Sequence, residues 1–169
     1  MGEKPVPTPR EDACSYAAGI YEGEGTVGAY LAGYGKHKLR RPQIELRIEM
    51  NDKDIIRFLA ETFGGNFVPR KRSAQVCFNE PNLVTFLKAV YPYLKGKRRR
   101  TQAALVFKLY KMKQQYLGRK DAHRCRLLAD MASRINSYNY KRTPRDYTYS
   151  TDDIVQTASL GEEVAQSAA

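Results

Sequence analysis

The chain has 169 residues, of which 42% are hydrophobic and 11% aromatic, a composition that is typical of a globular protein and excludes an intrinsically disordered one. Its 29 Lys and Arg against 18 Asp and Glu give a net charge of +11, which favours a polyanionic partner, either nucleic acid or an anionic membrane surface. No segment approaches the roughly 18 apolar residues of a membrane span, and the N-terminus lacks an apolar signal-peptide core, so we expect neither a membrane-spanning helix nor a signal peptide.

The sequence predicts one domain between two less ordered ends. Residues 1–12 contain three prolines and are expected to form an extended arm. A single domain is expected over residues 13–160, and residues 161–169 are expected to form a flexible tail. Residues 150–169 contain four acidic side chains and no Lys or Arg, so the rest of the chain is more basic than the net charge indicates.

The first predicted elements are a helix and two strands. Residues 13–22 have the composition of a helix, and Gly23 and Gly25 are expected to end it by adopting the left-handed backbone conformation that glycine permits. Residues 27–31 then alternate in polarity, which predicts a strand. A second strand is predicted over residues 44–50, where every second residue is apolar.

The same order of elements then repeats. Residues 51–54 offer helix-capping side chains before an apolar helix, which the glycine pair at 64–65 is expected to end. Two strands follow over residues 66–79. Pro81 favours the first turn of the next helix, which is predicted over residues 82–94, since its missing N–H group is not needed there.

Further helices are predicted near the C-terminus, over residues 101–117, 121–137 and 151–159. The order of elements is therefore αββαββα followed by C-terminal helices. This order predicts an α+β fold with a four-stranded antiparallel sheet backed by helices.

One face of the predicted sheet is polar and basic, and we expect it to bind double-stranded DNA. Arg and Gln are the side chains that read guanine and adenine edges in the major groove, and a β-ribbon fits that groove. An ordinary solvated sheet face is the alternative. The predicted DNA-binding residues on this face are Gln43, Glu45, Arg47, Arg70, Arg72, Gln75 and Asn79, with Lys36, Lys38 and Arg40 from the preceding basic loop.

Two acidic residues, Glu22 and Glu24, lie at the predicted C-terminal end of the first helix. That end carries a partial negative charge, so a carboxylate there costs about 0.3–1 kcal/mol. A divalent cation offsets this cost directly, and magnesium is commonly held by one or two carboxylates together with substrate phosphate oxygens. The alternative is a pair of solvated surface acids beside a glycine turn.

Small residues form a smooth stripe on the first helix, because Gly19 and Gly23 are four residues apart and Ala18 lies beside them. Gly19 costs a helix about 1 kcal/mol relative to alanine, and close contact with another backbone is a plausible compensation. If two copies of this helix pack together, their acidic ends emerge side by side. Ala18, Gly19, Glu22 and Gly23 are therefore the predicted homodimer interface.

The nine residues from Ala17 to Gly25, AAGIYEGEG, resemble the LAGLIDADG motif of homing endonucleases. The order of elements, the basic sheet and the chain length are similar to the single-motif, homodimeric branch of that family. The resemblance covers residues 13–155. It implies an intron-encoded, site-specific DNA endonuclease that acts as a homodimer on a long, near-palindromic target.

The resemblance also assigns roles to individual residues. Glu24 matches the last acid of the motif and is implied to be a catalytic metal ligand, with Gly23 beside it at the metal. Asp52 matches a polar residue that assists metal or water. Asn51 remains the alternative at that site, and helix capping is the alternative role for Asp52. Lys97 matches the active-site lysine.

Two features depart from the family pattern. Both motif acids are Glu rather than Asp, one methylene longer. The second active-site base of the family would fall near Ile55 or Ile56, neither of which can act as a base. Lys141 and Arg142, in a basic connector, resemble the loop with which the family contacts the DNA backbone.

The resemblance implies Mg²⁺ as the cofactor, with Mn²⁺ able to replace it and Ca²⁺ supporting binding without cleavage. No small-molecule cofactor is expected. No membrane partner is expected either, because no predicted helix has a bulky apolar face free of the core. A non-cleaving DNA-binding regulator or an RNA-splicing maturase of the same fold remains the alternative function.

Three scattered cysteines, odd in number and without CxxC spacing, predict free thiols rather than disulfides or a zinc site. We therefore expect an intracellular protein in a reducing compartment, either the cytoplasm and nucleoid or an organelle.

Overall fold

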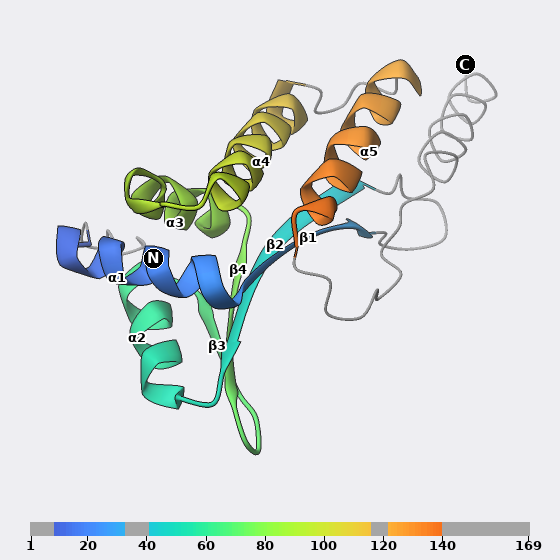
Figure 1. Ribbon diagram of the computed structural model, residues 1–169. Helices are drawn as coiled ribbons and strands as arrows, with labels where there is room; N and C mark the ends of the chain where they lie inside the picture. Colours follow the sequence, from blue (N-terminus) through green and yellow to red (C-terminus); the bar gives the residue numbers. More distant parts are fainter. Residues whose placement is uncertain (1–8, 33–40, 116–121, 140–169) are drawn as a thin grey trace, which may run out of the picture. The chain divides into compact units, whose positions relative to one another are not determined.

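The computed structural model describes residues 9–32, 41–115 and 122–139 (Figure 1). The predicted DNA contacts Lys36, Lys38, Arg40, Lys141 and Arg142 lie outside these residues, as does the predicted helix over 151–159. The elements follow the predicted order and are α1 (Glu11–Glu24), β1 (Gly25–Ala32), β2 (Arg41–Met50), α2 (Lys53–Phe63), β3 (Asn66–Pro69), β4 (Ala74–Asn79), α3 (Asn82–Val90), a 3₁₀ turn η1 (Tyr91–Tyr93), α4 (Lys97–Gln115) and α5 (Ala122–Ser137).

The four strands form one sheet in the order β1-β2-β4-β3, which confirms the predicted α+β fold. Strand β4 pairs antiparallel with β2 on one side and with β3 on the other. The chain forms two compact units, residues 1–27 with 45–103 and residues 28–44 with 104–169. The prediction of one domain over residues 13–160 stays a prediction.

The first unit is organised around an aromatic core. Strands β2 and β4 turn alternate apolar residues inward, as their period-two pattern predicts. Phe78 of β4 stacks on Phe86 of α3, with ring centroids 4.5 Å apart. Phe63 of α2 and Tyr21 of α1 meet the same Phe86 ring edge-on, at 5.2 and 6.2 Å. One ring therefore connects three helices to the sheet.

Helix α2 begins and ends as its sequence predicts. Asp52 caps its start by accepting hydrogen bonds from the backbone N–H groups of Asp54 and Ile55. Gly64 ends the helix in the left-handed conformation, with φ of 75°, and Asn82 donates to its carbonyl oxygen at 2.8 Å. These local signals operate within a few residues, which is why the prediction succeeded.

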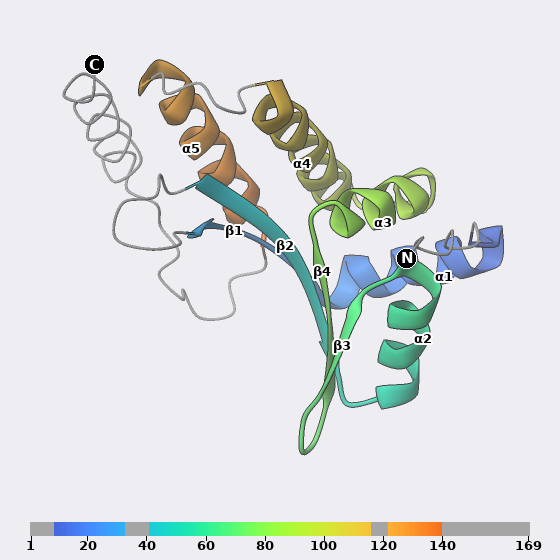
Figure 2. The ribbon, with the colours of Figure 1, turned by 180° about the vertical axis from the view of Figure 1, so that it is seen from behind.

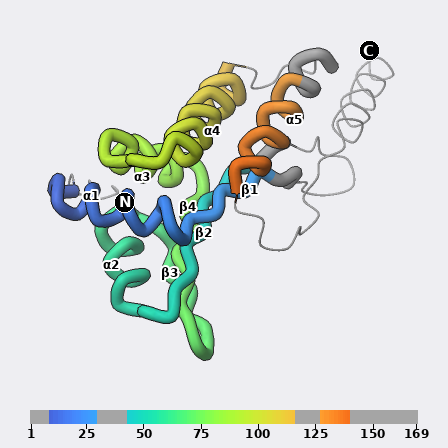
Figure 3. Tube along the Cα trace, viewed as in Figure 1, coloured from blue at the N-terminus to red at the C-terminus, as the bar shows by residue number. Residues whose placement is uncertain are grey.

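Helix α1 ends differently from the prediction, which was wrong about its glycines. Gly23 lies inside the helix, and Gly25 follows it in an extended conformation, with φ of −71° and ψ of 138°. The chain passes straight from α1 into β1, so no left-handed residue is needed (Figure 3). Glycine is required at position 25 for space, because a Cβ there would lie 2.3 Å from the Tyr21 ring.

The boundaries of the next two helices also differ from the prediction. Pro92 cannot donate the hydrogen bond that a continuing helix needs, and the helix after β4 gives way to the turn η1 at Tyr91. Helix α4 begins at Lys97, four residues before the predicted start at Thr101. The reason is a distant carboxylate, Glu22, that accepts hydrogen bonds from the backbone just before the helix.

In the second unit, the side chain of Asn136 connects α5 to strand β1. The amide of Asn136 accepts a hydrogen bond from the backbone N–H of Ala29 at 2.9 Å and donates to the carbonyl oxygen of the same residue at 3.1 Å. Strand β1 is at the edge of the sheet, and this amide satisfies two of its backbone groups. Among the helices of residues 9–32, 41–115 and 122–139, none is both long and apolar enough to cross a membrane.

Candidate active site at the end of the first helix

Glu24 is the last residue of α1, and its side chain is exposed. Within the part of the chain that the structure describes, its carboxylate makes no hydrogen bond or ion pair. Gly23 beside it is exposed as well. The end of the helix therefore presents the Glu24 carboxylate, a hard oxygen donor, to an incoming ligand.

Glu22, two residues earlier, has a different environment. It is half-buried, and its Oε1 atom accepts hydrogen bonds from the backbone N–H groups of Lys95 at 2.7 Å and Gly96 at 2.5 Å. These two residues lie directly before α4, so the carboxylate serves the N-terminal end of that helix. Glu22 is therefore neither a free surface acid nor a free metal ligand.

Arg99 completes the contact between α1 and the start of α4. Its side chain is buried, with 2% of the residue exposed. Nε donates to the carbonyl oxygen of Glu22 at 3.4 Å, and Nη2 donates to the carbonyl oxygen of Gly25. Nη1 donates to Oε1 of Gln102 at 2.8 Å, and the guanidinium lies 5.2 Å from the centroid of the Tyr21 ring.

Sequence reasoning missed Arg99 because it lies within a run of Lys and Arg that looks like a solvated surface. The signal was the helical period: Arg99 is followed by buried residues at Gln102, Ala103, Val106 and Leu109. These positions share one face of a helix, so the arginine continues a buried stripe.

Lys97 is the first residue of α4 and is exposed. The hydrogen bonds of Glu22 and Arg99 hold its turn against the end of α1. The structure thus brings the elements that carry Glu24 and Lys97 together, although the two residues are far apart in sequence. Among the described residues, neither makes a hydrogen bond with Asp52.

Asp52 performs the capping role that was its alternative. Both of its hydrogen bonds use Oδ1, to Asp54 N at 3.1 Å and to Ile55 N at 3.3 Å, and its side chain is exposed. Asn51 is exposed too. The catalytic role of Asp52 stays a prediction, since a capping aspartate can also serve a ligand through its second oxygen.

Capping and catalysis at Asp52 are separable by two substitutions. Asp52→Asn preserves a good N-cap, whereas Asp52→Ala removes it and is expected to lower the free energy of unfolding by about 1 kcal/mol. Urea denaturation measures this difference. If Asp52 also assists the metal, the two variants should lose cleavage activity to a similar extent despite their different stabilities. Equal stability of both variants would contradict the capping role.

The predicted DNA-reading residues share one face of the sheet. The register places Glu45 opposite Asn79, Arg47 opposite Cys77, and Glu49 opposite Gln75. Burial raises the pKa of the Cys77 thiol, so this side chain is a neutral group on the face.

Acidic partners order the basic side chains of this face. Glu45 pairs with Arg47. Arg70 Nε lies 3.7 Å from Glu49 Oε1, and Arg70 Nη2 donates to Gln75 Oε1. Gln75 is only 5% exposed, so it orients Arg70 more than it faces a ligand.

The remaining predicted contacts on the sheet lie at its ends. Arg72 is exposed in the turn between β3 and β4, and that hairpin projects beyond α2 (Figure 2). Asn79 is exposed at the end of β4, and Gln43 is half-buried on β2.

The predicted dimer interface separates into two faces of α1. Ala18 is 1% exposed and packs in the core of its own chain, so it offers little surface to a second copy, and the interface stays a prediction. Gly19 and Gly23 lie on the exposed face, and a Cβ added at either would meet no atom within 4 Å. Nothing within the described chain therefore requires glycine at these two positions.

The donor set suits magnesium only with help from a substrate. In the described ranges, no group of three or more His, Cys, Asp or Glu side chains is placed to hold a metal ion. Glu24 provides one carboxylate, and magnesium usually completes its octahedral shell with water and phosphate oxygens. The residues present fit a metal that is shared with a phosphate-bearing ligand.

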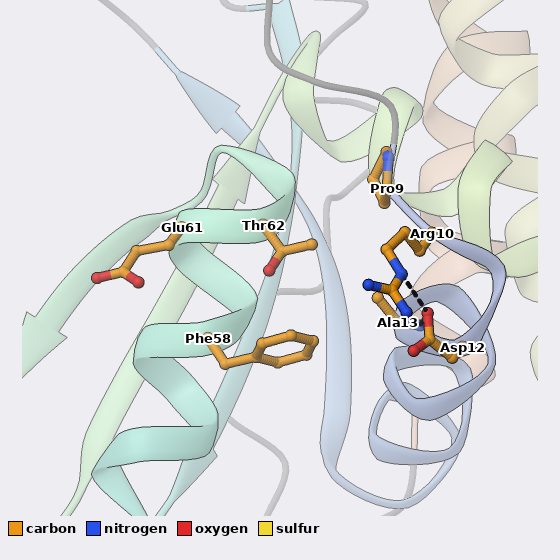
Figure 4. Close-up of a pocket in the computed structure, with 7 residues that line it drawn as sticks. All are labelled: Pro9, Arg10, Asp12, Ala13, Phe58, Glu61 and Thr62. Carbon is orange, nitrogen blue, oxygen red and sulfur yellow. Dashed lines mark hydrogen bonds and ion pairs between the residues drawn. The ribbon is translucent and has the colours of Figure 1, made fainter.

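A separate cleft of about 430 Å³ lies between the start of α1 and α2 (Figure 4). An ion pair between Arg10 and Asp12, with Nε and Oδ1 3.5 Å apart, forms one wall, and the ring of Phe58 belongs to the other. The cleft contains none of the predicted site residues. Its lining residues are Pro9, Arg10, Asp12, Ala13, Phe58, Glu61 and Thr62.

Neither protein-family profiles nor curated proteins show a match to this sequence. Solved structures do match. The homing endonuclease I-CvuI in complex with its target has a TM-score of 0.73 and 19% identity, over 89% of this chain and 96% of that one. The archaeal intron-encoded homing endonuclease I-Vdi141I complexed with DNA has a TM-score of 0.70 and 13% identity, over 91% and 99%.

A third structure is longer. The LAGLIDADG meganuclease I-AabMI bound to uncleaved DNA has a TM-score of 0.59 and 16% identity, over 76% of this chain but 46% of that one. The chain therefore has the fold of the LAGLIDADG homing endonucleases, which confirms the resemblance at the level of the fold.

Proposed function

We propose that this chain is a homodimeric, Mg²⁺-dependent endonuclease that cuts double-stranded DNA at a long, near-palindromic site. The observation that carries the proposal is the exposed Glu24 carboxylate at the end of α1, held beside the turn that begins with Lys97. The carboxylate of the neighbouring Glu22 already accepts two backbone hydrogen bonds within the chain, so the two motif acids have different roles.

The proposed chemistry uses few groups of the protein. Glu24 would hold Mg²⁺ together with DNA phosphate oxygens, and bound Mg²⁺ supplies Lewis-acid stabilisation of the phosphate and a water of lowered pKa. The Lys97 ammonium group would stabilise the charge that develops on the phosphate. Mn²⁺ would replace Mg²⁺, and Ca²⁺ would support binding without cleavage.

Two observations support a dimer. Two copies of Glu24 would supply one carboxylate for each DNA strand, and the described residues of one chain present one such carboxylate at the end of α1. The chain spans nearly the full length of I-CvuI but about half of I-AabMI, as expected if two copies correspond to one longer chain. The open glycines Gly19 and Gly23 would let two α1 helices approach closely.

The sheet face would lie in the major groove. Arg47 and Arg70 would match guanine edges, and in the free protein each pairs with an acidic side chain, Glu45 or Glu49. Exposed Arg72 on the projecting hairpin would reach the next bases or the backbone. The net charge of +11 supports the same partner.

The test begins with selection of a target from a randomised duplex library in Ca²⁺. The affinity for the selected duplex should fall by about 10³–10⁵ between 50 and 200 mM salt if ~6–10 phosphates are contacted. Replacing Ca²⁺ by Mg²⁺ or Mn²⁺ should then produce a double-strand cut. Failure to enrich any sequence would contradict the proposal. Binding without cleavage in either metal would favour a DNA-binding regulator, and selective binding of intron RNA would favour a maturase.

The same chemistry indicates where the protein acts. A DNA-cutting enzyme would act in the cytoplasm and nucleoid or in an organelle that holds DNA. Cys14 and Cys77 are free thiols, which fits a reducing compartment of this kind.

A further inference from the structure

The C-terminal end of α1 combines several negative charges. The last carbonyl groups of a helix lack intrahelical partners and carry a partial negative charge. Glu22 and Glu24 add carboxylates at this end, and the last turn of α1 contains no basic residue. A helix end of this kind tends to fray unless another part of the chain holds its backbone.

Arg99, which belongs to α4, holds the backbone at the end of α1. Its Nε and Nη2 groups donate to the carbonyl oxygens of Glu22 and Gly25. These two carbonyls lie on either side of Glu24 in the chain, so one guanidinium brackets the backbone of that residue. The guanidinium also places a full positive charge against the negative end of the helix.

The orientation of Arg99 is itself fixed. Gln102 is fully buried, and its Oε1 accepts from Arg99 Nη1 at 2.8 Å and from the Tyr21 hydroxyl at 3.2 Å. Burial raises the pKa of Tyr21 to about 12, although Arg99 opposes the shift, so the hydroxyl remains a donor at any pH at which DNA is stable. The Tyr21 ring lies against the guanidinium.

Glu22 forms a second tie between the same two segments. Its carboxylate holds the backbone of Lys95 and Gly96, and the next residue is Lys97. A Cβ at position 96 would lie 3.2 Å from Glu22 Oε1, so glycine there favours the close approach. The two ties fix the end of α1 and the start of α4 as one rigid corner.

We propose that Arg99 is a positioning residue that fixes the Glu24 backbone and thereby the place where the carboxylate meets metal and phosphate. This inference rests on the proposed endonuclease function. Arg99 touches neither DNA nor metal in this scheme, since it is buried. Its effect is geometric, and a displacement of about 1 Å at a reacting group typically costs about 100-fold in rate.

The test compares Arg99→Met, Arg99→Lys and wild type on the selected target. Met keeps much of the side-chain length but removes every donor. Lys keeps the charge but has no planar fork to bridge the two carbonyls and Gln102. We expect Arg99→Met to lower the single-turnover cleavage rate by about 100-fold, with target affinity in Ca²⁺ unchanged and a higher Mg²⁺ requirement. Arg99→Lys should be intermediate.

A second readout does not depend on cleavage. Binding of Mn²⁺ to the protein–DNA complex, measured from the spectrum of free Mn²⁺, should be weaker for Arg99→Met than for wild type. Lys108→Met is the matched control, because it removes a charge from an exposed position of the same helix. It should change neither the cleavage rate nor Mn²⁺ binding.

The outcomes separate the two proposals. Wild type that binds its target but never cuts would contradict the endonuclease function, and Mn²⁺ binding would then decide the role of Arg99. Equal Mn²⁺ binding or equal cleavage by Arg99→Met and wild type would overturn the positioning role. The positioning role would also be overturned if Arg99→Met lost target affinity and cleavage to the same extent. If circular dichroism shows Arg99→Met to be unfolded, a folded Arg99→Lys that cuts like wild type would overturn it.

Discussion

We expect Glu24→Gln to bind its target as wild type does and to lose Mg²⁺-dependent cleavage by at least about 10³-fold. The substitution keeps the size of the side chain and removes the charge that would hold the cation. The carboxylate makes no contact that stabilises the described part of the chain, and its charge lies at the unfavourable end of the helix dipole, so the melting temperature should not fall. Single-turnover cleavage and binding in Ca²⁺ measure the two effects separately.

Glu22→Gln is the matched comparison, two residues away on the same helix. Its amide oxygen can still accept from Lys95 and Gly96, but the hydrogen bonds lose their charge assistance. We expect a loss of about 1 kcal/mol in the free energy of unfolding, with most of the cleavage activity retained. Cleavage by Glu24→Gln at the wild-type rate, or a larger catalytic loss from Glu22→Gln, would assign the metal to a different residue.

The second large effect, dissociation of the proposed dimer, is expected from Gly19→Leu. The side chain would enter open space in the single chain, and leucine favours a helix over glycine by about 1 kcal/mol. The monomer should therefore remain folded, while the leucine prevents two α1 helices from approaching closely. Sedimentation should show a monomer, and the salt dependence of DNA binding should fall to about half, because one subunit contacts half of the phosphates.

Two control substitutions test whether close contact between two α1 helices is what leucine at position 19 prevents. Gly19→Ala adds a single methyl group and should weaken the dimer less than leucine does. Ala104→Leu introduces the same side chain at an exposed position of α4 and should leave the sedimentation of the protein unchanged. A stable Gly19→Leu dimer would show that α1 is not the interface.

The predicted fold succeeded where the information is local. The alternation of apolar residues along β2 and β4, the Asp52 cap and the left-handed Gly64 each depend on residues within a few positions of one another. The αββαββα order follows from such signals. The position of Glu24 at the end of α1 also follows, since only the limits of one helix decide it.

The sequence could not show the features of α1 that distant residues decide. Ala18 and Gly19 are adjacent small residues, and only packing shows that one is buried and the other exposed. The left-handed role assigned to Gly25 was wrong because the Tyr21 ring, rather than a turn, requires glycine there.

The sequence by itself therefore determined the order of elements and the acid at the end of the first helix. Only the tertiary structure decided how the two motif acids differ. Glu22 meets backbone 73 and 74 positions away, and Arg99 reaches back 74 positions to Gly25. The charge and the hydrophobic period of a sequence describe each helix by itself. The hydrogen bonds that hold the backbone of Glu24 form only when the end of α1 packs against the start of α4.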